Sequence, residues 1–390
     1  MLDWLIIGGG IHGTHLSRVL TANTPAGAAS VRVLDPHLEP LQRWRECTRN
    51  CGMEFLRSPL EDHLAEDPLS LFLYRRDHAA HTPAHLARRR GRAPLSVFNA
   101  HADDVITRYN LRDLRVQARA TGLTRTRDGL AVETTAGRIE SRRVLLAMGV
   151  TEQLRLPEWV GELPDGMARH VCAPGFDIAE APDWRHCVVV GGGMTAAQTA
   201  VALSKAGKGV VTLLSRGKLR CHDFDTDIEW IRPAGPVRLA QEPDFDKRRA
   251  MIEAGRHPGS VTANVEAALA LAVGLGRLTH AIDTVLRAEP TGGGEVRLEL
   301  ATGESLTADR LLIATGFDNR TSGGDWLDAA VDNLGLRTAA CGYPVADESL
   351  AWGSGVFVAG ALAELTIGPA ALNIAGARFA GRRFAALTSG

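Results

Sequence analysis

Two short glycine-rich segments of this chain have the spacing that holds a nucleotide pyrophosphate. Residues 8–13 read GGGIHG after an apolar run, and residues 191–196 read GGGMTA after another. In a strand–loop–helix unit of this kind the first glycine allows a sharp turn, the second lets the backbone approach the phosphates, and the third position needs a small residue for close helix packing. The helix that follows presents free N–H groups and the positive end of its dipole to the phosphates. The residues expected to contact dinucleotides through these loops are Gly8, Gly10, Ile11, His12, Gly13, Gly191, Gly193, Met194 and Thr195.

The residue at the end of the next strand distinguishes the two loops. Asp35 follows Gly13 by about 20 residues, where a carboxylate accepts hydrogen bonds from ribose hydroxyls and disfavours a 2′-phosphate. The corresponding stretch after the second loop ends in Ser215 and Arg216, and a guanidinium there can form a bidentate pair with a 2′-phosphate. The sequence therefore predicts FAD or NAD rather than NADP in the first site, and NADPH in the second. The alternatives are a solvated strand end at Asp35 and a solvated basic turn at Arg216.

Each glycine loop also opens a longer unit, and the two units end alike. Residues 130–149 and 296–316 both show period-two alternation, a glycine turn and a closing apolar strand. This pattern predicts a small antiparallel meander that feeds one buried strand in each unit. The expected fold class is therefore α/β, with two Rossmann-like domains that each carry a meander. The glycines that end the closing strands, Gly149 and Gly316, are expected to lie at the cofactors.

Composition places the chain among ordinary globular proteins. It has 390 residues, of which 45% are hydrophobic and 23% charged, so two domains are expected. The net charge of −1 argues against a nucleic-acid partner or an anionic membrane. No apolar stretch reaches the length of a membrane span, and the six cysteines form no dense framework, which favours a reduced, cytoplasmic protein. No group of residues has the spacing of a metal site.

The chain resembles the flavoproteins with two dinucleotide-binding domains, a superfamily that includes disulfide reductases and single-component flavin monooxygenases. The glycine loops and the strand end Ala314-Thr315-Gly316 carry this resemblance, which covers nearly the whole chain. It implies a glutathione-reductase-like fold in which the NADPH domain is inserted into the FAD domain. Residues 355–360 would then be a returning strand, with Gly360 and Ala361 at the flavin where many members have Gly-Asp. The implied boundaries are 1–151 for the first part of the FAD domain, 152–184 for a linker, 185–320 for the NADPH domain and 321–390 for the return, and residues 223–259 are polar and break the α/β alternation.

One segment resembles a narrower group, the amine N-hydroxylases that act on lysine or ornithine in siderophore assembly. Residues 52–58, the positions after them up to Tyr74, and the sequence ATGF at 314–317 carry this likeness. Leu56 and Glu61 stand where that group often has Gln and Lys, so lysine or ornithine is not implied as the substrate. The resemblance implies flavin contacts at Trp44 and Met53. The candidates to line the substrate pocket are Arg57, Ser58, His63 and Tyr74.

The expected activity is that of a single-component monooxygenase that uses NADPH, FAD and O2 on a small nucleophilic substrate such as an amine. The flavin carries the chemistry, so no side chain need act as a nucleophile. The alternatives are an NADPH-dependent reductase of a quinone, disulfide or protein carrier, and a dinucleotide sensor without turnover. Cys47 and Cys51 are the only closely spaced cysteines, and their i, i+4 spacing on a helix is poor geometry for a redox disulfide.

Overall fold

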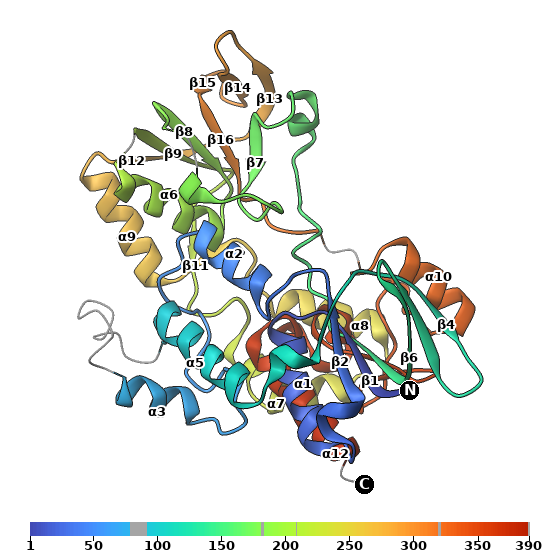
Figure 1. The fold of residues 1–390 in the computed structure, drawn as a ribbon. Helices are drawn as coiled ribbons and strands as arrows, with labels where there is room; N and C mark the ends of the chain where they lie inside the picture. The colour runs from blue at the N-terminus through green and yellow to red at the C-terminus, as the bar shows by residue number, and fades with distance from the viewer. Residues whose placement is uncertain (79–91, 181–182, 208, 319–320, 389–390) are drawn as a thin grey trace.

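The computed structural model describes residues 1–78, 92–180, 183–207, 209–318 and 321–388. These residues form two lobes, and both chain ends lie in the lower one (Figure 1). The first lobe contains the beginning and the end of the chain, and the second contains much of the middle.

The first lobe is built on an eight-stranded sheet. Its main path runs β17-β18-β6-β1-β2-β3, and β4 and β5 join β6 as an antiparallel meander. The central strand β1 is buried from Trp4 to Ile7, as a parallel strand covered on both faces should be. The strands are β1 (Leu2–Ile7), β2 (Val31–Asp35), β3 (Arg115–Gln117), β4 (Ala120–Arg125), β5 (Leu130–Thr134), β6 (Gly137–Leu146), β17 (Ala351–Gly353) and β18 (Val356–Val358).

The second lobe repeats this plan with a parallel sheet and a separate meander. The sheet order is β12-β9-β8-β16-β7, and β13, β14 and β15 form a three-stranded antiparallel sheet beside it. The fold class predicted from the two glycine loops is thus confirmed. The strands are β7 (Ala168–His170), β8 (His186–Val190), β9 (Val210–Ser215), β12 (Leu278–Ile282), β13 (Val285–Pro290), β14 (Val296–Leu300), β15 (Ser305–Ala308) and β16 (Arg310–Ile313), with a short pair β10 (Arg220–Cys221) and β11 (Ser260–Val261).

Helices cover both sheets. The α-helices are α1 (Ile11–Asn23), α2 (Gln42–Asn50), α3 (Ser70–Asp77), α5 (Leu95–Arg108), α6 (Met194–Ala206), α7 (Ala234–Ala240), α8 (Phe245–Ala254), α9 (Ala263–Gly274), α10 (Asp325–Leu334), α11 (Glu364–Ile367) and α12 (Ile374–Thr388). Short 3-10 turns are η1 (Gly27–Ser30), η3 (Leu111–Leu114), η4 (Glu158–Glu162), η5 (Ile178–Glu180), η6 (Ile228–Ile231), η7 (Gly360–Ala363) and η8 (Pro369–Leu372).

The last helix of the chain completes the core of the first lobe. α12 packs along α1, and its Phe384 meets the ring of Trp4 edge-on at a centroid distance of 5.7 Å. Phe357 of β18 lies 4.9 Å from the same indole. The first lobe is therefore closed only when the C-terminal segment has returned to it, as the resemblance implies.

The polar segment 223–259 does not fold with the second lobe. It forms α7 and α8, which pack against α11 in the lower lobe (Figure 1). The attachment is partly ionic, because the buried carboxylate of Glu364 pairs with Arg249 at 2.6 Å and also with Arg256. Trp230 and Leu239 of this segment are buried in the core of the first lobe. The prediction that residues 185–320 form one domain therefore differs from the structure at this segment.

The stretch expected as a linker also contributes to a sheet. Within residues 152–184, β7 pairs in parallel with β16 and forms an edge of the second sheet.

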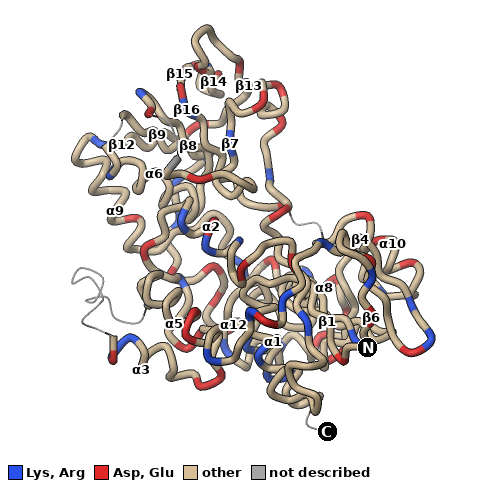
Figure 2. The backbone as a smooth tube through the Cα atoms, viewed as in Figure 1, with Lys and Arg blue, Asp and Glu red and all other residues tan. Residues whose placement is uncertain are grey.

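No helix among the described residues is both long enough and apolar enough to cross a membrane. Basic and acidic residues are interspersed along the backbone of both lobes (Figure 2).

Candidate functional site

The first glycine loop folds tightly against the end of β6. Gly8 has a φ of +112°, and a Cβ there would lie 2.5 Å from the carbonyl oxygen of Ala147. A Cβ on Gly13 would lie 1.7 Å from the carbonyl oxygen of Gly8, so α1 can approach this closely only with glycine. Gly10, in contrast, has open space where a Cβ would be and lines a cavity. The loop therefore presents bare backbone on the side where a pyrophosphate would bind.

Asp35, at the end of β2, is fastened to this loop. Its carboxylate accepts hydrogen bonds from the N–H of Gly9 at 2.5 Å and from the N–H of His37 at 2.8 Å, and it contacts the imidazole of His37 at 2.9 Å. Burial by itself raises the pKa of Asp35, but the hydrogen bonds from His37 and Gly9 outweigh burial and hold the pKa below its usual value. An ionised acceptor therefore stands at the cavity edge, where ribose hydroxyls could donate to it.

The second glycine loop repeats the backbone geometry of the first. A Cβ on Gly191 would lie 2.4 Å from the carbonyl oxygen of Ala314. The N–H of Gly191 donates to the carbonyl of Leu214 at 2.9 Å. The same bond in the first loop joins Gly8 to Leu34, also at 2.9 Å. The sequence repeat is thus a structural repeat.

Ser215 ends β9 at the position that Asp35 holds at the end of β2. Its hydroxyl donates to the carbonyl of Gly217 at 2.9 Å and contacts a ring nitrogen of His280 at 2.8 Å. The next residue, Arg216, is exposed. The side chain of Ser215 carries no negative charge that would repel a 2′-phosphate, and the residue after it is an arginine.

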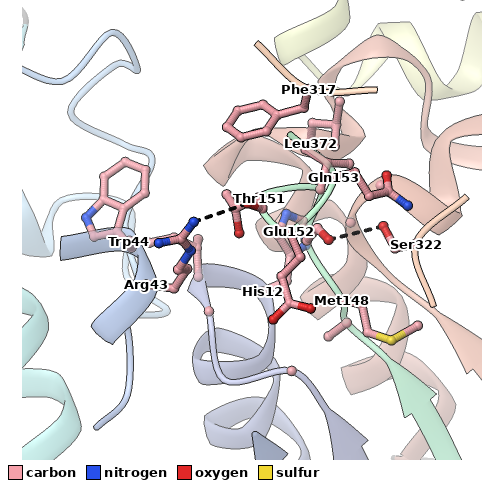
Figure 3. Close-up of a pocket in the computed structure, with 18 of the residues that line it drawn as sticks. His12, Arg43, Trp44, Met148, Thr151, Glu152, Gln153, Phe317, Ser322 and Leu372 are labelled. Carbon is pink, nitrogen blue, oxygen red and sulfur yellow. Dashed lines mark hydrogen bonds between the residues drawn. The ribbon is translucent and has the colours of Figure 1, made fainter. Parts of the chain in front are cut away.

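One large cavity lies between the two lobes, with a volume of about 1150 Å³. This is larger than the roughly 300–1,000 Å³ of most small-molecule pockets. Its wall includes Gly8 and Gly10 of the first loop, and Met194 and Thr195 of the second loop. Figure 3 shows Trp44 and Arg43 on α2 facing this space, with Phe317 and Gln153 across it. The two glycine loops therefore open on the same cavity.

Two of the chain crossings between the lobes pair with each other beside this cavity. Leu154 and Phe317 form an antiparallel bridge, and the N–H of Asp318 donates to the carbonyl of Gln153 at 2.8 Å. The side-chain amide of Gln153 donates to the carbonyl of Thr321 at 2.8 Å. Because Gln153, Phe317 and Thr321 also line the cavity, its shape depends on how the lobes are set against each other.

Most of the predicted cofactor contacts surround this cavity. Its wall includes Gly8, Gly10, Ile11, His12, Asp35, Trp44, Met53, Gly149, Met194, Thr195, Gly360 and Ala361. Two predicted glycines lie behind the loops in tight backbone contacts, namely Gly13 and Gly191. The structure places four others outside the wall, in or next to the second sheet: Gly193, Ser215, Arg216 and Gly316.

The predicted pocket residues Arg57 and Ser58 both line the cavity. The Arg57 guanidinium, however, donates to the carbonyls of His222 at 2.8 Å and Phe224 at 2.6 Å. It also donates to the hydroxyl of Ser260 at 2.8 Å. Arg57 therefore ties the loop after α2 to the segment that precedes α7. It lines the cavity as predicted, and its contact with a substrate stays a prediction.

The other two predicted pocket residues lie outside the cavity wall. His63 is fully buried, meets His101 edge-on at 5.0 Å, and burial lowers its pKa to about 3. Tyr74 stacks on His78 at 4.0 Å. These rings pack among α3, α5 and the loop before α3. The contacts that the structure gives His63 and Tyr74 are therefore packing contacts.

The comparisons with known proteins agree with this geometry. Residues 2–231 match the sequence profile of the pyridine nucleotide-disulphide oxidoreductase family, which is more than half of the chain. The chain belongs to this family. It is thus an oxidoreductase, as predicted, and the resemblance stated from its motifs is confirmed. No curated protein sequence matches the chain.

Solved structures of similar fold include several N-hydroxylases. The ornithine N-hydroxylase of Kutzneria sp. 744, described with reduced FAD, NADP+ and L-ornithine, gives a TM-score of 0.79 at 16% identity and covers 100% of this chain and 99% of its own. The reduced ornithine hydroxylase of Pseudomonas aeruginosa gives the same values. The bacillithiol disulfide reductase of Staphylococcus aureus gives a TM-score of 0.64 at 15% identity, with 99% and 97% covered. At these identities the likeness establishes the fold.

Sequence analysis missed several residues of the oxidoreductase that shape the cavity. Arg43 donates to the carbonyl of Thr151 at 3.2 Å, and Ser322 donates to the carbonyl of Gly149 at 3.1 Å (Figure 3). Asn373 lies in the wall just before α12. Only the position of Arg43 next to Trp44 could have suggested one of them, because the other contacts join segments far apart in the sequence.

Two buried polar atoms in the wall fit a bound cofactor. The indole N–H of Trp44 and the side-chain oxygen of Gln153 have no hydrogen-bond partner among the described residues. Buried polar groups normally have a partner, so each points to a ligand group or ordered water. Together with the open space at Gly10 and the ionised Asp35, these residues fit a dinucleotide in the first loop.

His12 adds an uncharged donor to the same wall. Burial lowers its pKa to about 4, and the backbone of Asn373 only partly opposes this shift. A Cβ on Gly360, where φ is +65°, would lie 3.7 Å from the imidazole. The ring is therefore neutral near pH 7 and packed against η7.

Among the described residues, no cluster of His, Cys, Asp and Glu could hold a metal ion.

Proposed function

We propose that this oxidoreductase uses NADPH to reduce a bound FAD and inserts oxygen from O2 into a small nucleophilic substrate, as a single-component monooxygenase. The observation that carries the proposal is that residues of both glycine loops line one cavity. Two dinucleotides held this way would bring their reactive rings together in one space, which hydride transfer requires.

Each loop has the residues to hold its own dinucleotide. FAD would accept a hydride from NADPH and activate dioxygen. The backbone at Gly10 and the N-terminus of α1 bind the FAD pyrophosphate, and Asp35 accepts from its ribose. Trp44 and Met53 border the flavin ring. Arg216 pairs with the 2′-phosphate of NADPH, which selects NADPH over NADH.

The remaining wall would keep water from the reacting atoms. Phe317 and Leu372 face the cavity, and Phe224 lies in the same wall (Figure 3). An apolar enclosure of this kind suppresses wasteful loss of activated oxygen as peroxide. The N-hydroxylases of similar fold support an amine as the substrate class, because an amine nitrogen is a nucleophile. The scattered cysteines support a role in the reducing cytoplasm.

Oxygen stoichiometry tests this proposal. The FAD-loaded protein is mixed with NADPH in air, with and without each member of a panel of primary amines. NADPH oxidised, O2 consumed, peroxide released and hydroxylated product are measured together. A monooxygenase gives product with at least one amine, and the peroxide released then falls below the O2 consumed.

Two other outcomes would replace the proposal. Faster NADPH oxidation with quinones or disulfides, and no oxygenated product with any amine, would assign a reductase. NADPH binding without oxidation would assign a dinucleotide sensor.

A further inference from the structure

Helix α2 of the first lobe docks on the segment that follows β7 in the second lobe. The side chain of Asn50 donates to the carbonyl of Phe176 at 2.6 Å and accepts from the N–H of Ile178 at 3.2 Å. Arg49 pairs with the carboxylate of Asp177 at 3.0 Å. Figure 1 shows α2 at the junction of the lobes. This contact therefore joins the two lobes away from the chain crossings.

Two thiols come close together inside this contact. Cys47 on α2 is partly buried and packs against the second-lobe core, which includes the buried Cys172. The two side chains are near enough to influence each other, since their interaction lowers the pKa of Cys47 and raises that of Cys172. Arg43, one turn earlier on α2, donates to the main-chain carbonyl of Cys172. The fold thus brings the two cysteines into one buried cluster although 124 residues lie between them in the chain.

Cys51, one turn further along α2, is directed elsewhere. Its sulfur donates to the carbonyl of Thr48 at 3.4 Å and lies 3.8 Å from the side-chain oxygen of Gln198. Burial raises the pKa of Cys51 to about 12. The pair that is close in sequence, Cys47 and Cys51, is therefore not the pair that the fold assembles.

The two neighbouring thiols differ in acidity. The interaction with Cys172 lowers the pKa of Cys47, burial opposes this shift, and the positive charge of Arg43 supports it. The same interaction and burial raise the pKa of Cys172. Because the thiolate is the form that peroxide oxidises, Cys47 is the attacking sulfur and Cys172 the proton-bearing partner.

We propose that Cys47 and Cys172 form a reversible oxidation site, in which hydrogen peroxide converts these neighbouring thiols into a disulfide that ties the two lobes together. The Cys47 thiolate attacks one peroxide oxygen, the O–O bond breaks, and a sulfenic acid and hydroxide form. The sulfur of Cys172 then attacks the sulfenic sulfur, and the hydroxyl leaves with the thiol proton as water. Overall, two thiols and one peroxide give one disulfide and two waters.

The proposed function supplies a local source of the oxidant, since reduced flavin that reacts with O2 without a substrate releases peroxide. The disulfide would also act on the cavity, because α2 carries Arg43 and Trp44 in the cavity wall. The thiol chemistry itself needs only added peroxide. Its test therefore stays valid if the flavin assignment fails.

Disulfide mapping tests this proposal. The full-length protein is reduced, freed of reductant, exposed to a small excess of hydrogen peroxide, alkylated and digested without reductant. The expected product is a cross-linked peptide pair containing Cys47 and Cys172, which disappears after treatment with dithiothreitol. On a non-reducing denaturing gel, the oxidised chain should run faster, because the bond closes a large loop.

Four cysteine variants sharpen the result. Cys47→Ser and Cys172→Ser should each lose the gel shift, while Cys51→Ser and Cys341→Ser, which keep both partners, should retain it. In Cys172→Ser the sulfenic acid at Cys47 should persist long enough for a dimedone probe to label it. The proposal is overturned if the cross-link joins Cys47 to Cys51, if Cys47 is over-oxidised without any cross-link, or if neither thiol reacts.

Discussion

The two glycine loops share a backbone and differ in the side chains that complete it. In both, a Cβ on the first glycine would collide with the carbonyl of an alanine, Ala147 in one lobe and Ala314 in the other. At the third position the first loop has Gly13, whereas the second has the buried Ala196. The first loop therefore packs its helix more closely than the second.

The ends of the following strands differ more. Asp35 is a partly buried, ionised acceptor held by the loop itself, whereas Ser215 is neutral and is followed by the exposed Arg216. The common backbone fixes where a pyrophosphate can bind, and the strand end decides which ribose fits. The comparison implies that one fold unit, used twice, would discriminate between FAD and NADPH through a few side chains at the strand end.

The largest effect is expected at the third loop position. Gly13→Ala puts a Cβ 1.7 Å from the Gly8 carbonyl oxygen and must displace α1 from the loop. FAD affinity should fall by about 100-fold, in line with the cost of overpacking. Flavin retained after gel filtration measures this, with circular dichroism as the folding check. The matched Ala196→Gly change in the second loop should leave FAD bound, and equal retention by both variants would remove the contrast between the loops.

The acidic strand end should give the next largest effect. Asp35→Asn loses the charge that accepts from Gly9 and His37 and from the proposed ribose. We expect the Kd for FAD to rise by roughly 10- to 100-fold, the worth of a charge-assisted hydrogen bond. Ser215→Ala should leave FAD binding unchanged. Calorimetric titration of the apoprotein with FAD compares them, and an unchanged Kd for Asp35→Asn would contradict the ribose assignment.

A smaller effect is expected at the basic strand end, because Arg216 is exposed. Arg216→Ala should raise the KM for NADPH by about ten-fold through the loss of one charged hydrogen bond. The KM for NADH, which lacks the 2′-phosphate, should hardly change. Steady-state kinetics with both coenzymes on the same preparation provides the internal control. Equal losses for NADPH and NADH would show that Arg216 does not read the phosphate.

The smallest effect is a pH dependence of opposite sign at two histidines, His37 in the first lobe and His280 in the second. The hydrogen bond to Asp35 raises the pKa of His37, so its stabilisation is complete below about pH 6.5 and is lost as pH rises through the raised value. Burial lowers the pKa of His280, so the folded state is disfavoured as pH falls below about 6.5. Each contribution should stay below about 1 kcal/mol of unfolding free energy.

Denaturant unfolding across this pH range measures the two contributions. His37→Gln should reduce the loss of stability as pH rises. His280→Gln should reduce the loss as pH falls, while the share from the buried His12 and His63 remains. The same change of slope in both variants would contradict the assignment.

Much of the fold could be predicted from the sequence because its signals are local. The glycine spacing, the acid at the end of β2 and the alternation of apolar and polar residues in the meanders each lie within a short stretch of sequence. The glycine loops and meanders occur twice, and this repeat predicted the two lobes. The segment 223–259 could not be placed in this way. It joins the first lobe through Trp230 and the Glu364 ion pairs, which depend on residues more than a hundred positions away.

The residues of the candidate site also fall into those that local motifs predict and those that depend on long-range contacts. Residues on the loops, such as Gly10 and Asp35, were predicted and lie at the cavity. Pocket residues inferred from the resemblance to the N-hydroxylases were harder to predict. The Arg57 guanidinium holds the segment before α7, and His63 is buried away from the cavity. The proximity of Cys47 to Cys172 had no signal in sequence, since it exists only once the lobes have docked.

The most direct test of the whole account is anaerobic mixing of the FAD-loaded protein with NADPH while the flavin absorbance is followed. The account predicts that FAD binds to the purified chain and is bleached rapidly by NADPH, and more slowly by NADH at equal concentration. A chain that refuses FAD, or a bound flavin that stays oxidised in the presence of NADPH, would contradict it.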